Sequence, residues 1–307
     1  MFTKHRLLQG AAILTAAGLA SRLMGFFFRI FLSHAFGEES VGLYQLIFPV
    51  YALCLSVSTA GIQTAVSRMT AEKVSLGQKE AAGNVLRIAL CLTLLLSLAE
   101  VLLIQQNAGH IAETFLGDPR CTEMLLIISY ALPCAAVHSC ICGYSFGMQR
   151  TELPAASQLI EQTARILFVV LLFIFMKDTG RTPSIKLAAA GIAAGEFASA
   201  VFSSKMLSAR KTFGQMPSLA AISQNTRELL TLSLPLTANR AAVTLLQSVE
   251  AASIPASLKL YGLDGSAAIS TYGVLTGMAL PCILFPSAIT NSVGTVLLPA
   301  VSAAQAS

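Results

Sequence analysis

The stretch LLQGAAILTAAGLASRLMGFFFRIFLSHAF, residues Leu7–Phe36, decides the fold of this chain. Its length and apolar composition suit a helix that crosses a bilayer, because about 30 helical residues span about 45 Å. Two arginines, Arg22 and Arg29, interrupt the stretch. Their spacing of seven positions places them within about 20° of each other on one helix face. A charge inside a membrane is costly unless it meets water or a partner, so this face predicts a functional cavity.

The composition of the whole chain is that of a membrane protein. Of its 307 residues, 55% are hydrophobic and only 11% are charged, whereas charged residues make up about 25% of a soluble protein. This composition excludes a soluble globule. The formal net charge is +5, but the basic residues are scattered at the ends of apolar runs. That pattern is typical of membrane orientation signals, so we expect a lipid bilayer and no nucleic acid as partner.

Runs of about 20 apolar residues predict a polytopic, all-α membrane protein with about eight transmembrane helices. A β-barrel would instead show segments of about ten alternating residues. The first run follows Lys4-His5-Arg6 and resembles a secretory signal, but it continues to Phe36, so we expect a retained span. The break at Gly37–Ser40 predicts a hairpin between the first two spans. The predicted spans are residues 7–34, 41–66, 84–104, 122–147, 155–176, 185–207, 228–256 and 267–301.

The distribution of Lys and Arg predicts how these spans are oriented and grouped. With a cytoplasmic N-terminus, eleven of these residues lie at inner span ends and five at outer ends, as expected for a multi-pass protein of the cytoplasmic membrane. Residues 208–227 predict a cytoplasmic linker. It would divide a complete six-helix first lobe, residues 1–207, from the first two helices of a second lobe, residues 228–307. The polar connection 70–84 predicts a short amphipathic helix on the inner surface.

Basic residues within the spans are candidates for a substrate-binding site. Arg240 lies near the middle of the seventh span, and Gln247 lies on the same helix face. Together with Arg22 and Arg29, these residues would line a water-filled, cationic cavity between the two lobes. Guanidinium groups match phosphate oxygens through two parallel hydrogen bonds, so such a cavity would suit a pyrophosphate-bearing substrate.

The acidic residues within the spans offer a simpler explanation of the same charges. Glu196 and Glu250 could neutralise the arginines by direct pairing. Glu161 and Arg165 are four positions apart with the glutamate first, which favours a structural ion pair along one helix. Glu100 lies one turn from the predicted end of its span, where its carboxylate could reach the headgroup region. Both explanations remain open from the sequence.

No motif in the sequence predicts catalysis or a cofactor. Cys134, His138 and Cys142 recur on one helix face at a spacing that could hold Zn²⁺. No second histidine or carboxylate lies beside them, so we interpret them as a packed apolar face and expect no metal. The seven cysteines are interpreted as reduced, buried side chains. We find no P-loop, G-x-S-x-G or H-E-x-x-H motif, which argues against an enzyme and against a built-in ATP motor.

Several motifs resemble the stage V sporulation protein B group of polysaccharide-biosynthesis membrane proteins, within the multidrug/oligosaccharidyl-lipid/polysaccharide (MOP) exporter superfamily. The motifs run from the first predicted span into the eighth. They depart from the group at Phe146, where glutamine is usual. The motifs are SRLMG at 21–25, FGEESVGLYQ at 36–45, GIQTAVSR at 61–68, GYSFGMQ at 143–149 and LTGMALP at 275–281.

This resemblance implies two six-helix lobes, as in multidrug exporters of the superfamily, and alternating access. It also implies a flippase that moves lipid-linked oligosaccharide or peptidoglycan precursors from the inner to the outer leaflet for cell-wall, polysaccharide or spore-envelope synthesis. In the related lipid II flippases, arginines of the first span of each lobe line the cavity, and Arg22, Arg29 and Arg240 occupy comparable spans. Only two spans follow the linker, so we expect the chain to be truncated.

Two other functions are compatible with the same sequence. One is a cation-coupled multidrug exporter, in which an acidic pair would bind the coupling ion, and Glu196 and Glu250 are its candidates. The other is a non-transporting membrane scaffold for wall-synthesis enzymes. The sequence identifies neither the coupling ion nor the particular saccharide.

Overall fold

The computed structural model describes residues 4–209 and 219–284, and every regular element in these ranges is helical. Seven helices are long and apolar enough to cross a membrane, and the bent pair α5 and α6 makes eight. This confirms the predicted all-α architecture of about eight spans. The elements are α1 (Lys4–Phe36), α2 (Glu38–Leu55), η1 (Ser56–Ala60), α3 (Gly61–Ser75), α4 (Lys79–His110), η2 (Ile111–Phe115), α5 (Cys121–Ser129), α6 (Ala131–Gly147), α7 (Glu152–Asp178), α8 (Lys186–Ser208), α9 (Leu219–Leu260), α10 (Gly265–Gly273) and η3 (Val274–Ala279).

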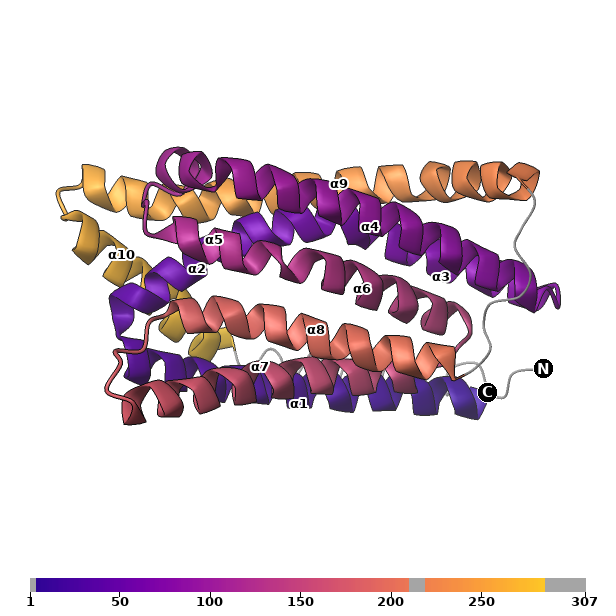
Figure 1. Cartoon of the computed structure of the whole chain (residues 1–307), viewed down its shortest axis with the longest axis horizontal. Helices are drawn as coiled ribbons and strands as arrows, with labels where there is room; N and C mark the ends of the chain where they lie inside the picture. Colours follow the sequence, from indigo (N-terminus) through magenta and orange to yellow (C-terminus); the bar gives the residue numbers. More distant parts are fainter. Residues whose placement is uncertain (1–3, 210–218, 285–307) are drawn as a thin grey trace, which may run out of the picture.

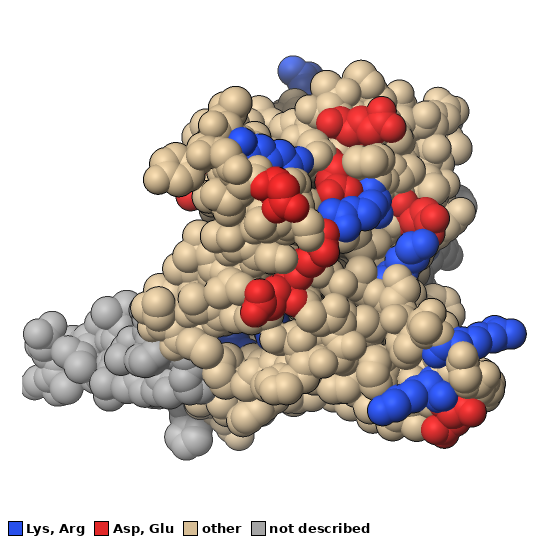
Figure 2. Space-filling view, turned by 90° about the vertical axis from the view of Figure 1, so that its left-hand side faces the viewer, with Lys and Arg blue, Asp and Glu red and all other residues tan. Residues whose placement is uncertain are grey.

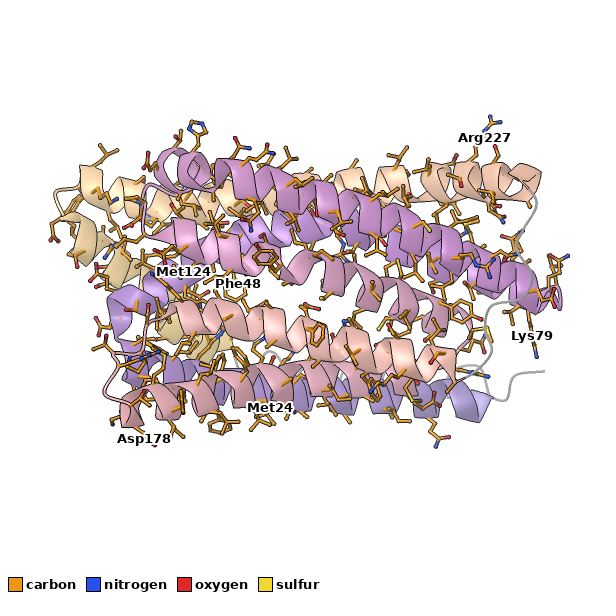
Figure 3. All side chains as sticks on the ribbon, in the orientation of Figure 1. Met24, Phe48, Lys79, Met124, Asp178 and Arg227 are labelled. Atoms are coloured by element: carbon orange, nitrogen blue, oxygen red, sulfur yellow. The ribbon has the colours of Figure 1, made fainter. Side chains whose placement is uncertain are left out.

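Successive spans run in opposite directions along the bundle (Figure 1). The turn between α3 and α4 and the start of α9 lie at one end, where Figure 3 labels Lys79 and Arg227. We call this the Lys79 end. The α7–α8 connection after Asp178 and the α9–α10 turn lie at the opposite end, the α10 end. This alternation is what the sequence predicted for spans joined by short connections.

The helices pack as a bundle whose outer surface is apolar. In the first part of the chain, α1 packs against α7, α7 packs against α8, and α6 lies among α3, α4 and α8. In the second part, α9 packs on α2, α3 and α4, while α10 packs on α2. Large apolar side chains remain exposed on the outside, as a hydrocarbon surrounding requires. Examples are Leu95, Leu98, Leu102 and Leu103 of α4 and Leu167, Leu171, Ile174 and Phe175 of α7.

Charged side chains gather at the α10 end, where acidic and basic groups alternate over the surface (Figure 2). Arg120 binds Glu39 at 2.7 Å and Asp118 at 2.8 Å, so one guanidinium joins the start of α2 to the η2–α5 loop. From α9, Lys259 Nζ donates to the Gly117 carbonyl at 3.0 Å. Burial raises the pKa of Asp118, but the hydrogen bonds from Arg120 outweigh it and the net pKa is lowered. These contacts tie the two parts of the chain together at this end.

The connection between α3 and α4 differs from the prediction. Residues Thr70–Ser75 continue α3, and α4 begins at Lys79, so no separate amphipathic helix forms. Gly77 adopts a φ of 76°, and the Gly77 and Gln78 amides donate to the carbonyls of Val74 and Lys73. This left-handed turn closes the last turn of α3 and reverses the chain within three residues. The polar residues of the segment therefore extend the two spans.

Several spans, including the two on either side of the α3–α4 turn, are longer than predicted. The span that begins at Lys79 continues to Phe115 and is 37 residues long. Glu100 thus lies well inside it with both carboxylate oxygens buried, and the prediction that it reaches the headgroups near a span end is wrong. Helix α9 begins at Leu219, within the segment predicted as linker, and residues 210–218 lie outside the described structure.

Close approach of α7 and α8 depends on glycine. A Cβ atom at Gly195 would lie 2.7 Å from the Glu161 carbonyl oxygen, which no real contact allows. A Cβ at Gly191 would overlap the Val169 side chain. The backbones of α7 and α8 can therefore come this close only because α8 has glycine at positions 191 and 195.

We expect Gly195→Ala to lower the free energy of unfolding by about 1–3 kcal/mol, because α8 must move away from α7. The measurement is thermal unfolding of the purified protein in detergent. Gly18→Ala is the matched control, since Gly18 is helical and a Cβ there meets nothing within 4 Å. The control should be neutral or stabilising by up to about 1 kcal/mol. Equal melting temperatures for the two variants would contradict the proposed contact.

Candidate functional site

A cavity of about 340 Å³ opens between the first part of the chain and its last described segment. Helices α1, α2 and α7 supply most of its wall, and residues beyond η3 close it. Its lining residues are Ser21, Arg22, Gly25, Phe26, Phe28, Arg29, Leu32, Tyr44, Phe48, Gln162, Arg165, Pro281 and Leu284.

Three arginines line this cavity. Arg22 and Arg29 come from one face of α1, as their spacing of seven predicted, and Arg165 comes from α7, which packs against α1. Gln162 lies one turn before Arg165. A Cβ at Gly25 would stand 3.3 Å from Gln162 Nε2, so glycine leaves room for this amide. The cavity therefore offers three guanidinium groups and one amide as hydrogen-bond donors.

The remainder of the wall is apolar and aromatic. Phe26, Phe28 and Phe48 contribute rings, and the Tyr44 and Phe48 rings meet edge to face at 4.9 Å. None of the described lining residues is a carboxylate. A group that fits this wall carries negative charge beside an apolar portion.

The structure does not bring every predicted site residue to this cavity. Arg22 and Arg29 line it, whereas Arg240 and Gln247 are exposed on α9 and are not among its lining residues. Helix α9 packs on α2, α3 and α4, away from α1 and α7. Helix periodicity identifies the residues that share one face of a helix. It does not identify which other helix packs against that face.

The predicted contact between Glu161 and Arg165 is present, with Arg165 Nη2 donating to Glu161 Oε1 at 2.5 Å. The sequence suggested a purely structural pair, but Arg165 also lines the cavity. Its guanidinium is therefore shared between a carboxylate behind the wall and the cavity in front of it. The signal that could have revealed this is the run Glu161-Gln162-Arg165, in which Gln162 and Arg165 lie one turn apart on the same helix face.

Behind this wall lies a buried polar cluster formed by α2, α6, α7 and α8. Tyr51 donates to Glu196 Oε1 at 3.1 Å, and His138 Nδ1 lies 3.7 Å from Glu196 Oε2. One donor atom each of His138, Glu161 and Glu196 lie within 4.8 Å of one another. Glu196 therefore does not serve to neutralise the α1 arginines, as the alternative interpretation required. We call His138, Glu161 and Glu196 the buried triad.

His138 contacts residues that the sequence did not connect to it. Its Nε2 lies 2.9 Å from Ser157 Oγ and its Nδ1 lies 3.2 Å from Ser199 Oγ. The cysteines on its own helix were the only neighbours visible in the sequence, and the interpretation as a packed apolar face is wrong for His138. Its partners come from α7 and α8, 19 and 61 positions away.

A bundle of apolar helices around a cationic cavity defines a multi-pass membrane protein, and solved structures place its fold among transporters. A MOP superfamily transporter from Pyrococcus furiosus matches with a TM-score of 0.63 at 18% identity, over 96% of this chain and 64% of that one. The MATE multidrug transporter DinF-BH, solved in complex with R6G, matches with a TM-score of 0.69 at 16% identity, over 97% of this chain and 66% of that one. The fold is thus that of the MOP superfamily.

The chain belongs to the family described as polysaccharide biosynthesis protein, which it matches over residues 7–305. It is 35% identical to stage V sporulation protein B of Bacillus subtilis (strain 168), over 97% of this chain and 58% of that protein. It is 27% identical to the lipid II flippase MurJ of the same organism, over 54% of this chain and 32% of that protein. The family resemblance found in the sequence is confirmed. The chain spans little more than half the length of stage V sporulation protein B.

Proposed function

We propose that this protein is a flippase that moves lipid-linked oligosaccharide or peptidoglycan precursors across the cytoplasmic membrane. The observation that carries the proposal is the cavity lined by Arg22, Arg29 and Arg165 with no described carboxylate. Guanidinium groups bind phosphate oxygens in pairs, so a pyrophosphate is the group that this wall suits best. The aromatic side of the cavity suits the adjoining apolar or saccharide portion. The relative named lipid II flippase MurJ supports the same substrate class.

Orientation and lobe organisation complete the proposal. The Lys79 end faces the cytoplasm, α1 to α8 form the first lobe, the segment between Ser208 and Leu219 is the cytoplasmic linker, and the second lobe starts with α9. The substrate enters the cavity from the inner leaflet and leaves toward the outer leaflet as the lobes rock about it. The translocated saccharide precursor serves cell-wall, polysaccharide or spore-envelope synthesis, as the relatives' names suggest. The chain's own residues bind and reorient the substrate without breaking a bond in it.

A basic cavity disfavours the alternative of an exporter for cationic drugs. The arginines would repel a cationic drug, and this repulsion is strong where the surroundings have a low dielectric constant. A direct binding comparison separates the two. The purified protein in nanodiscs is titrated with a polyprenyl-pyrophosphate disaccharide, with the same disaccharide on a polyprenyl monophosphate, and with a lipophilic dye cation.

We expect the pyrophosphate to bind at least about tenfold more tightly than the monophosphate, because one phosphate fewer loses at least one charge-assisted pair. The dye cation should not compete. Equal affinity for the two lipids would contradict recognition of the pyrophosphate group. Tight binding of the dye cation would favour a drug exporter.

A further inference from the structure

We propose that the buried triad, His138, Glu161 and Glu196, is a binding site for a divalent transition-metal cation of the Zn²⁺ class. The three residues come from three helices, α6, α7 and α8, and one donor atom of each lies within 4.8 Å of the other two. One imidazole nitrogen and two carboxylate oxygens are a donor set that Zn²⁺ accepts, with a fourth position open to water. Metal–ligand distances of about 2.0–2.2 Å require the donors to approach by about 1 Å. Side-chain rotation of the two glutamates supplies this movement.

Glu196 has an unused oxygen that points into this cluster. The residue is only 7% exposed, and its Oε1 accepts from the Tyr51 hydroxyl. Its Oε2 is buried without a hydrogen bond, and the side chain that it faces is His138, at 3.7 Å. A buried carboxylate oxygen that makes no hydrogen bond is costly. A cation held between Glu196 and His138 satisfies that oxygen.

The surroundings of His138 suit a metal ligand. Ser157 Oγ donates to the Pro154 carbonyl at 3.0 Å, so its oxygen can accept a hydrogen bond from the N–H of His138 Nε2 at 2.9 Å. This tautomer leaves the Nδ1 lone pair on the side of Glu196. Ser199 Oγ, 3.2 Å from Nδ1, has the Glu196 carbonyl as a second acceptor at 2.9 Å, so its hydroxyl can turn away. A ligating histidine whose other nitrogen is held by a hydrogen bond is the usual arrangement at protein metal sites.

Charge selects a divalent ion and links the triad to the cavity. When Arg165 turns away from Glu161, Glu161 and Glu196 together carry two negative charges, which one divalent cation matches. Arg165 already uses Glu161 Oε1, so the cation and this guanidinium compete for the same carboxylate. Binding of the metal frees Arg165 for the cavity that it also lines. This last step rests on the proposed function of the cavity, whereas the metal site itself does not.

The test is metal binding to the purified protein in detergent, without a histidine tag. The chain has three other histidines, His5, His34 and His110, and all three are changed to glutamine in the background protein. Zn²⁺ affinity is measured by calorimetry, and Co²⁺ absorption reports the ligand type. We expect one Zn²⁺ per chain and a Co²⁺ spectrum of nitrogen and oxygen ligands.

The variants are expected to change affinity in opposite directions. His138→Ala and Glu196→Gln should weaken Zn²⁺ binding by more than the roughly 10- to 100-fold that loss of a supporting contact costs. Arg165→Met removes the competing cation and should tighten binding on the order of tenfold, a gain that misfolding cannot produce. Glu100→Gln, in α4 and outside the triad, is the matched control and should bind as the background protein does.

Three outcomes overturn the site. They are Zn²⁺ binding that survives His138→Ala, a thiolate-to-cobalt charge-transfer band that assigns the ion to cysteine, and weaker binding in Arg165→Met. No lipid-linked substrate is present in these measurements, so their failure would leave the proposed flippase function untouched. Conversely, a confirmed metal site would not by itself support transport.

Discussion

Alanine at Arg22 or Arg29 in this protein should reduce translocation of a lipid-linked pyrophosphate precursor by at least about 100-fold, because each guanidinium can contribute two charge-assisted hydrogen bonds to phosphate oxygens. Both residues line the cavity. The measurement is the rate at which a fluorescent precursor becomes accessible on the outer side of proteoliposomes. Lysine at the same positions keeps the charge but loses the planar fork, and should restore only part of the rate.

Two further arginines make this experiment discriminating. Arg181→Ala, in the exposed α7–α8 connection, is the matched control and should transport at the unaltered rate. Arg240→Ala tests whether the substrate binds in the observed cavity or also needs Arg240, which the sequence predicted as a site residue. We expect Arg240→Ala to lower the transport rate much less than Arg29→Ala does, since Arg240 is exposed on α9. Undiminished transport by both Arg22→Ala and Arg29→Ala, with normal expression, would refute the role assigned to the cavity.

Valine at Gly42 is expected to separate α2 from α10. A Cβ at Gly42 would overlap the backbone carbonyl of Ile269, and a Cβ at Gly273 would overlap the Glu38 carbonyl from the other side. Backbone atoms cannot give way as a side chain can, so α10 must leave its place. We expect amide hydrogen exchange in Gly265–Gly273 to accelerate by at least about tenfold, which corresponds to the lower part of the 1–3 kcal/mol cost of overpacking.

The exchange measurement has its own internal comparison. Gly109→Ala, where a Cβ meets nothing within 4 Å, should leave α10 exchange unchanged. Exchange in α8 should also stay the same in Gly42→Val, because the main packing partners of α10 are α2, α9 and η3. Faster exchange throughout the chain would indicate general destabilisation, and unchanged α10 exchange would contradict the close helix contact.

The sequence predicted those features that depend on local chemistry. Apolar runs of bilayer length gave the spans, and the Glu161–Arg165 pair followed from helix periodicity alone. The α3–α4 connection was missed because polarity between 70 and 84 suggested a surface helix, whereas a single left-handed residue, Gly77, is enough to reverse the chain. A hydropathy profile does not show where the chain reverses direction between two helices.

The candidate site was predicted only as far as α1 extends. Arg22 and Arg29 share one helix, but Arg165 joins them through the packing of α1 on α7, and no periodicity contains that packing. The polar cluster around the buried triad is hidden further, since Glu196 meets Tyr51 from 145 positions away and His138 from another helix. Arg240 shows the converse case, in which a charge in mid-span is exposed on α9 and does not line the cavity.

Helix α9 has 42 residues and is therefore about 63 Å long. A bilayer with its headgroups is only about 40–45 Å thick. The helix therefore exceeds the thickness of the bilayer by about 20 Å, and its start lies at the Lys79 end, close to Arg227 (Figure 3). A tilt of about 10° about the opposite end would sweep its tip through about 11 Å. A fluorophore attached near the start of α9 would therefore report small rotations of this helix as large displacements.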